Sequence, residues 1–143
     1  IYPAKDEEQM LDSSKRLLGD SLFGAPSYYA ARAMADRGED IYFYHFNQKP
    51  SGKAGEILGA FHASEIAYVF GVGGLGPIED PELSRIMLAY WTNFSKIGSP
   101  NGDDIPDWET MKLNKDTWHL LGPKIGQENI SRMNIYNLLR RIS

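Results

Sequence analysis

The spacing of apolar residues predicts helices in four parts of the chain. The clearest covers residues 81–97, where apolar side chains recur at intervals of three and four. Asp80 before this segment and Gly98 after it are residue types that commonly cap helices. The same spacing predicts three more helices, at residues 6–18, 26–37 and 129–142. The stretches 20–25 and 48–55 lack the pattern and are expected to be non-helical connections.

One segment has the pattern of a strand covered on both faces. Residues 41–46, IYFYHF, are aromatic or β-branched on both sides, which is typical of a parallel sheet flanked by helices. Residues 117–121 form a weaker candidate strand. A strand of this kind needs neighbours to pair its backbone groups, and the chain supplies few. We therefore predict an α/β fold with an incomplete sheet and flanking helices. Since the chain starts at Ile1 rather than methionine, we expect it to belong to a longer protein.

Composition excludes several classes of function. The 143 residues are 42% hydrophobic and 24% charged, as in ordinary globular proteins, and they contain no cysteine for disulfides or thiolate chemistry. The net charge of -4 and the lack of any basic run argue against a nucleic-acid partner. No apolar run approaches the roughly 18 residues that a membrane span needs.

Histidine placement argues against a metal site. His45, His62 and His119 are far apart and form no HxxxH or HxH pair, so we expect neither a metal nor another cofactor. His45 lies inside the aromatic strand and is expected to be a packed core residue. His119, beside Trp118, is expected at a surface or an interface.

The glycine-rich segment 71–76 satisfies the GxGxxG pattern of dinucleotide sites. In such sites a helix begins within the glycines and turns its N-terminus toward the pyrophosphate. Here Pro77 intervenes, and the next helix is predicted only from residue 81. No strand ending in an acidic residue follows about 20 residues later. A flexible glycine loop is the better interpretation.

His62 is the residue best placed for chemistry. It lies among small and polar residues in GAFHASEIAYVFG, residues 59–71, where a loop at the end of a sheet would present it as a general base. A general base needs a nucleophile and an acidic partner, but the chain has no GxSxG elbow. Ser64 and Glu65 are too close in sequence to complete a triad, and Glu65 is expected to cap or hydrogen-bond the turn. From these residues alone, a structural role for His62 stays open and is the commoner one.

The segment GAFHASEIAYVFG resembles the catalytic-histidine region of type-B carboxylesterases, the group that includes cholinesterases and bacterial para-nitrobenzyl esterases. YWTNFSKIGSPNG, residues 90–102, is similar to the family's next helix and loop. The strand at 41–46, and Asp20 with Phe23, match the family's spacing. The resemblance spans nearly the whole chain and is least distinctive over the last 30 residues.

This resemblance implies an α/β-hydrolase fold with a triad in the chain order serine, acid, histidine. Only the third member maps onto this sequence, as His62. Residues 1–143 are then the C-terminal portion of a catalytic domain. The serine nucleophile, the acid and the oxyanion hole would belong to an N-terminal portion, the implied partner of this chain. The implied substrate is a small carboxylic ester.

Two consequences of the resemblance stay open at this point. The chain is either part of an active serine carboxylesterase or an inactive hydrolase-like fragment or interaction module, as in some cholinesterase-like adhesion proteins. His62 favours the enzyme, since adhesion makes no demand on that residue. The absence of cysteine favours a bacterial-type member, because animal relatives usually carry disulfides.

Overall fold

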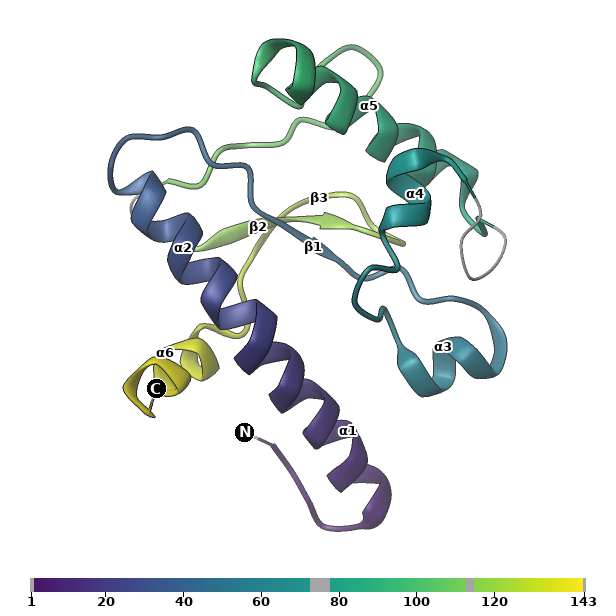
Figure 1. Cartoon of the computed structure of the whole chain (residues 1–143), viewed down its shortest axis with the longest axis vertical. Coiled ribbons are helices and arrows are strands. Elements are labelled where there is room, and N and C mark those ends of the chain that lie inside the picture. Colours follow the sequence, from purple (N-terminus) through teal and green to yellow (C-terminus); the bar gives the residue numbers. More distant parts are fainter. Residues whose placement is uncertain (1, 73–77, 113–114, 143) are drawn as a thin grey trace. The chain divides into compact units, whose positions relative to one another are not determined.

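A computed structural model describes residues 2–72, 78–112 and 115–142, with the side chains of Ala54 and Ile142 left out. The elements are drawn in Figure 1 and belong to two compact units. Unit 1 consists of Ile1–Phe43, Met111–Thr117 and Asn129–Ser143. Unit 2 consists of Tyr44–Thr110 and Trp118–Glu128.

Unit 1 is helical. Its helices are α1 (Glu7–Gly19), α2 (Ala25–Ala35) and α6 (Met133–Ile142). Between α1 and α2 the chain runs through a π-helical turn, η1 (Asp20–Gly24), without leaving the helical conformation. The expected connection at residues 20–25 is therefore wrong. Gly19 does not end the helix, because the backbone N–H of Asp20 still donates to the carbonyls of Arg16 and Leu17.

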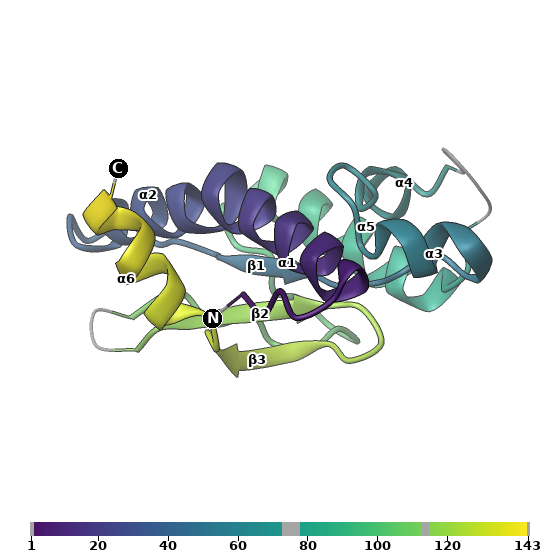
Figure 2. The same ribbon diagram turned by 90° about the horizontal axis from the view of Figure 1, so that it is seen from below.

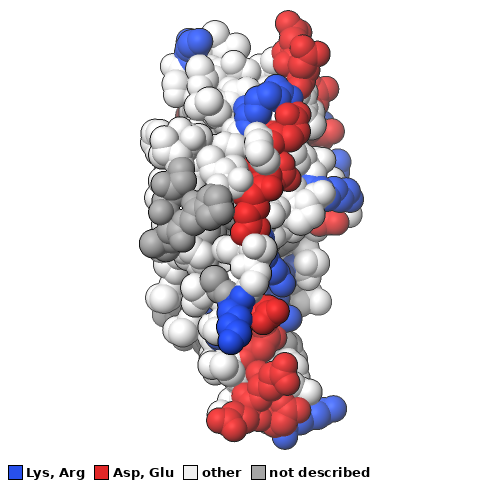
Figure 3. All heavy atoms as spheres, turned by 90° about the vertical axis from the view of Figure 1, so that its right-hand side faces the viewer, with Lys and Arg blue, Asp and Glu red and all other residues white. Residues whose placement is uncertain are grey.

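The start of α1 follows from its first residues. The Asp6 carboxylate accepts a hydrogen bond from the backbone N–H of Gln9 at 2.8 Å and so caps the helix. Glu7 and Glu8 occupy the first turn, where negative charge is favourable beside the exposed N–H groups. In Figure 3 acidic side chains gather at the lower end, where α1 begins in Figure 1.

Tyrosines fill the interior of unit 1. Tyr28 of α2 and Tyr136 of α6 are both buried, with ring centroids 5.9 Å apart. Gly24 allows η1 to approach α6, because a Cβ atom at this position would lie 2.6 Å from the Tyr136 hydroxyl. The Tyr28 hydroxyl donates to Asp116 at 2.5 Å, and burial followed by this hydrogen bond raises the pKa of Tyr28.

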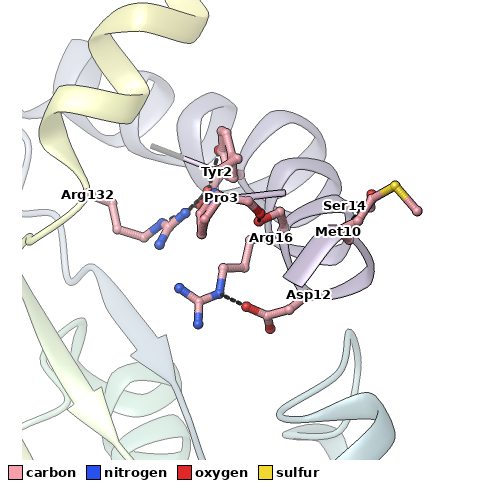
Figure 4. A network of polar contacts seen from close by, with 9 residues as sticks. Tyr2, Pro3, Met10, Asp12, Ser14, Arg16 and Arg132 are labelled. Atoms are coloured by element: carbon pink, nitrogen blue, oxygen red, sulfur yellow. Dashed lines mark hydrogen bonds and ion pairs between the residues drawn. The ribbon is translucent and has the colours of Figure 1, made fainter. Parts of the chain in front are cut away.

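A part-buried ion pair links η1 to the segment just before α6. The Asp20 side chain in η1 is 8% exposed, and Arg132, just before α6, donates to both of its carboxylate oxygens. The Tyr2 hydroxyl donates to the same carboxylate at 2.7 Å. In Figure 4 the Arg132 side chain points toward Tyr2. Because residues 20 and 132 are 112 positions apart, this contact fixes the path of the chain rather than a local turn.

Unit 2 is built around a small sheet. Its strands are β1 (Tyr44–Phe46), β2 (Thr117–Leu121) and β3 (Gly126–Asn129), in that spatial order. The first residue of β2 and the last residue of β3 belong to unit 1. β1 pairs in parallel with β2, so that Tyr44 lies opposite His119 and Phe46 opposite Leu121 (Figure 2). The strand predicted at 117–121 is confirmed. The one predicted at 41–46 is confirmed only over its second half.

The helices of unit 2 are α3 (Gly52–Leu58), α4 (Ile66–Phe70) and α5 (Pro81–Ile97). α5 matches its prediction: the Asp80 carboxylate accepts from the Leu83 N–H at 2.9 Å, and Gly98 ends the helix with φ +72°. Sequence reasoning missed α3 and α4. The polar turn expected at 48–55 instead leads into α3, and an apolar run as short as α4 has no readable period.

The sheet and helices together give the predicted α/β fold with an incomplete sheet. Among the residues that the structure describes, no helix has both the length and the apolar character needed to cross a membrane. Many large apolar side chains are exposed on both units. The most exposed include Leu11, Leu18, Leu22, Ile57, Phe70 and Ile97.

Candidate active site

His62 lies in a tight turn between α3 and α4, and its side chain is exposed. The turn is closed by Ser64, which bonds the carbonyl oxygen of Phe61 twice. Its backbone N–H donates at 3.1 Å and its hydroxyl at 2.6 Å. His62 is therefore the second residue of a four-residue turn, and it is exposed there.

The residue after His62 has an unfavourable backbone conformation. Ala63 has φ +69°, in the left-handed region that costs a non-glycine residue about 1–2 kcal/mol. His62 is not among the described non-glycine residues with positive φ. A left-handed residue at the third position alone is typical of a type II turn, in which glycine is preferred there. The surroundings of Ala63 therefore have to maintain its strained backbone conformation.

The helix that follows the turn is fixed to its surroundings. The buried ring of Tyr68 in α4 packs against Phe46 of β1, with centroids 5.5 Å apart. The buried Ser84 hydroxyl of α5 donates to the Tyr68 carbonyl at 2.9 Å. The C-terminal side of the His62 turn is thus anchored to both a strand and a helix.

Glu65 does not have the capping role expected from the sequence. It occupies the N-cap position of α4, but its side chain makes no capping hydrogen bond. The pKa of Tyr44 in β1 is raised mainly by burial and in second place by the negative charge of Glu65. The Glu65 carboxylate therefore interacts electrostatically with a residue of β1. The hydrogen bonds that hold the turn come from Ser64 instead. Because the Ser64 hydroxyl donates to Phe61, it does not pair with an imidazole as a nucleophile would.

The other two histidines have roles opposite to those expected. His119 on β2 is fully buried, stacked on Trp108 with centroids 4.9 Å apart. Its Nε2 lies 3.1 Å from the Tyr90 hydroxyl, which donates to the Pro106 carbonyl at 2.6 Å. The Tyr90 oxygen therefore accepts from His119, whose ring is neutral with its proton on Nε2. His45 is exposed and stacks on Trp118, with centroids 4.4 Å apart.

The chain matches the model of the carboxylesterase family over residues 2–137. The chain belongs to this family. The predicted membership of the type-B carboxylesterases is thereby confirmed, and so is the α/β-hydrolase fold, of which this chain holds a part. Whether this carboxylesterase chain is of a bacterial type stays a prediction.

Three relatives illustrate the similarity. A medium-chain fatty acyl-CoA hydrolase precursor of Anas platyrhynchos is 39% identical over 121 residues, 80% of this chain and 22% of the relative. The liver carboxylesterase of Sus scrofa is 37% identical over 113 residues, 74% of this chain and 19% of the relative. Carboxylesterase 5A of Homo sapiens is 35% identical over 132 residues, which are 83% of this chain and 23% of the relative. The carboxylesterase chain thus spans about a fifth of the length of these proteins.

The alternative sites are weaker in this carboxylesterase chain. Within the described parts of the chain, no three His, Cys, Asp or Glu side chains lie together as a metal site requires. Most of the GxGxxG segment, residues 73–76, and Pro77 lie outside the described residues. A cavity of about 530 Å³ lies in unit 1, bordered by α2 and α6. None of its lining residues is a histidine, so it offers no base of the kind that an esterase triad uses.

Sequence reasoning missed Ser64 and Ala63 as residues that shape the site. The available signal was the tetrapeptide Phe61–Ser64, because a serine can close a short turn through its own hydroxyl. The left-handed conformation of Ala63 had no signal, since glycine is the residue that marks such positions.

The buried His119 gives a prediction for acid stability. Burial lowers the pKa of His119 to about 4 from 6.5, so the folded state resists the protonation that the unfolded chain accepts. The stabilisation is fully present above pH 6.5 and is lost as the pH falls toward 4. Over that range unit 2 should lose about 3 kcal/mol of unfolding free energy. Urea unfolding followed by tryptophan fluorescence measures it, since all three tryptophans lie in unit 2.

Two variants separate His119 from other acid-sensitive groups. His119→Gln cannot titrate, so its unfolding free energy should fall less between pH 7 and pH 4.5 than that of the wild type. His45→Gln is the matched control and should lose as much as the wild type, because His45 is exposed. An equal loss in His119→Gln and the wild type would contradict the assignment.

Proposed function

We propose that the protein is a serine carboxylesterase in which this chain supplies the catalytic histidine, His62. The observation that carries the proposal is the exposed imidazole on a hydrogen-bonded turn, within the segment that most resembles the family's catalytic-histidine region. α4 anchors this turn through Ser84 and Phe46. A base placed on an anchored turn meets the need for precise positioning.

His62 has two tasks in the proposed reaction. Its neutral imidazole accepts the proton of a serine hydroxyl as the serine oxygen attacks the ester carbonyl carbon. The imidazolium then gives this proton to the alkoxide oxygen of the leaving alcohol, which leaves an acyl-enzyme. In the second half His62 activates a water molecule in the same way, and the serine is regenerated with release of the carboxylic acid. Glu65 has a supporting role near the turn.

The rest of the machinery is assigned to the larger part of the protein. We propose that residues 1–143 form the C-terminal portion of the catalytic domain, completed by an N-terminal portion with the serine, the acid and the oxyanion hole. Two features support such a partner: the exposed apolar side chains, such as Leu18 and Phe70, and the position of β1 at the edge of its sheet. An edge strand presents backbone groups for a further strand.

The substrate is proposed as a class. The printed names of the relatives include carboxylesterases and a fatty acyl-CoA hydrolase. Esters and thioesters are both cleaved by attack on an acyl carbonyl, so the role of His62 is the same for either. A small carboxylic ester is the proposed substrate. The second candidate function is an inactive hydrolase-like interaction module, and the presence of His62 in its family motif favours the enzyme.

Comparing the isolated chain with the full-length protein tests this proposal. The full-length protein should hydrolyse a small p-nitrophenyl ester with saturation kinetics. The isolated 143-residue chain should be no faster than an equal concentration of free imidazole groups, because nucleophile and oxyanion hole carry most of the rate. Turnover by the isolated chain, or none by the full-length protein, would contradict it.

A further inference from the structure

The His62 turn combines a strained residue with an unusually complete closure. Ala63 has φ +69°, a conformation that an alanine leaves readily when nothing opposes it. Ser64 places two donors on the Phe61 carbonyl, its N–H at 3.1 Å and its hydroxyl at 2.6 Å. The hydroxyl bond depends on the identity of the side chain at position 64, whereas the N–H bond does not.

The two sides of the turn differ in what holds them. On the C-terminal side, the Tyr68 carbonyl accepts from Ser84, and the Ile66 N–H donates to the Ala63 carbonyl at 3.3 Å. These contacts fix the chain after Ala63. The bonds to Phe61 are the contacts that close the turn across His62 itself. Loss of the Ser64 hydroxyl therefore removes one of the two bonds that fix the backbone at His62, without releasing α4.

We propose that Ser64 is a positioning residue, which acts through His62 by holding Ala63 in its left-handed conformation and so fixing where the imidazole points. This inference rests on the proposed function. A general base transfers a proton only within hydrogen-bond reach of its partner, and a displacement near 1 Å costs about a hundredfold in rate. Partial freedom of the turn should therefore slow proton transfer while ester binding is unchanged.

Four versions of the full-length protein test the role of Ser64: the wild type, Ser64→Ala, Ser64→Thr and the double variant Ala63→Gly with Ser64→Ala. kcat is expressed per competent site by titration with a fluorophosphonate, which removes the effect of unfolded protein. Ser64→Ala should lower kcat by about tenfold and change KM by less than about twofold. Ser64→Thr, which keeps the hydroxyl, should restore kcat.

The double variant separates positioning from general loss of structure. Glycine adopts the left-handed conformation without strain, so Ala63→Gly should recover a large part of the kcat lost in Ser64→Ala. A purely structural role for Ser64 would lower the number of sites titrated by the fluorophosphonate in Ser64→Ala and leave kcat per competent site unchanged. An unchanged kcat in Ser64→Ala, or no recovery with Thr and Gly, would overturn the inference.

Hydrogen exchange on the full-length protein distinguishes failure of this inference from failure of the proposed function. The residue-64 amide closes the turn, so its exchange should be several-fold faster in Ser64→Ala and unchanged in Ser64→Thr. Equal exchange in the wild type and Ser64→Ala would overturn the inference whatever the activity. A wild-type protein that reacts with neither ester nor fluorophosphonate would overturn the proposed function. Ser64 could then still close the turn, but it would have no effect on catalysis.

Discussion

His62→Ala in the full-length protein is expected to lower kcat for ester hydrolysis by roughly 10⁴-fold or more. Without the imidazole, the serine hydroxyl keeps its proton during attack and the leaving alcohol receives none. KM should change little, because His62 acts on the serine proton rather than on the ester. The measurement is kcat and KM on a small p-nitrophenyl ester, together with circular dichroism.

His45→Ala is the matched control for this result. His45 is also exposed, on β1, and its ring stacks on Trp118 rather than lying in the His62 turn. The His45→Ala variant should keep a kcat within about twofold of the wild-type value and should fold normally. If His62→Ala kept more than a tenth of the wild-type kcat, or failed to fold, a structural role for His62 would be the better interpretation.

Arg132→Met is expected to destabilise unit 1 by about 3–5 kcal/mol. The substitution leaves the Asp20 carboxylate, 8% exposed, with the Tyr2 hydroxyl but without its cation. A buried charge that loses its partner costs much more than an exposed one. Urea unfolding followed by far-ultraviolet circular dichroism, and hydrogen exchange of the α1 and α6 amides, measure the loss.

Arg16→Met is the matched control in the same unit. Arg16 pairs with Asp12 at 2.9 Å (Figure 4), but these side chains are 59% and 56% exposed. Its removal should cost less than about 1 kcal/mol. Adding Asp20→Asn to Arg132→Met should recover part of the larger loss, because the uncompensated charge is gone. Equal losses in Arg16→Met and Arg132→Met would contradict the assignment.

Local signals were sufficient for the long helices. α5 could be predicted with both of its ends, since Asp80 and Gly98 act through neighbours a few residues away. α1 was predicted with its first turn for the same reason. The junction of α1 and α2 was not, because Asp20 is held by Arg132, a residue 112 positions distant. A contact at that separation leaves no mark in the local pattern.

The burial of the histidines likewise depends on distant residues and could not be predicted from the local sequence. His119 was expected at a surface and His45 in the core, and the structure reverses both. Burial of His119 depends on Trp108 and Tyr90, which come from other parts of unit 2. The exposure of His62 on a loop was foreseen, whereas the hydrogen bonds of Ser64 became visible only with the backbone in place. The catalytic role of His62 remains a prediction.

The central claim is that His62 activates a serine located outside residues 1–143. We would label the full-length protein with a fluorophosphonate, map the modified residue by mass spectrometry and compare the labelling rate with that of His62→Ala. We expect one labelled serine outside these residues and a labelling rate at least about a hundredfold lower in the variant. A label on a serine within residues 1–143, or equal rates in the two proteins, would contradict it.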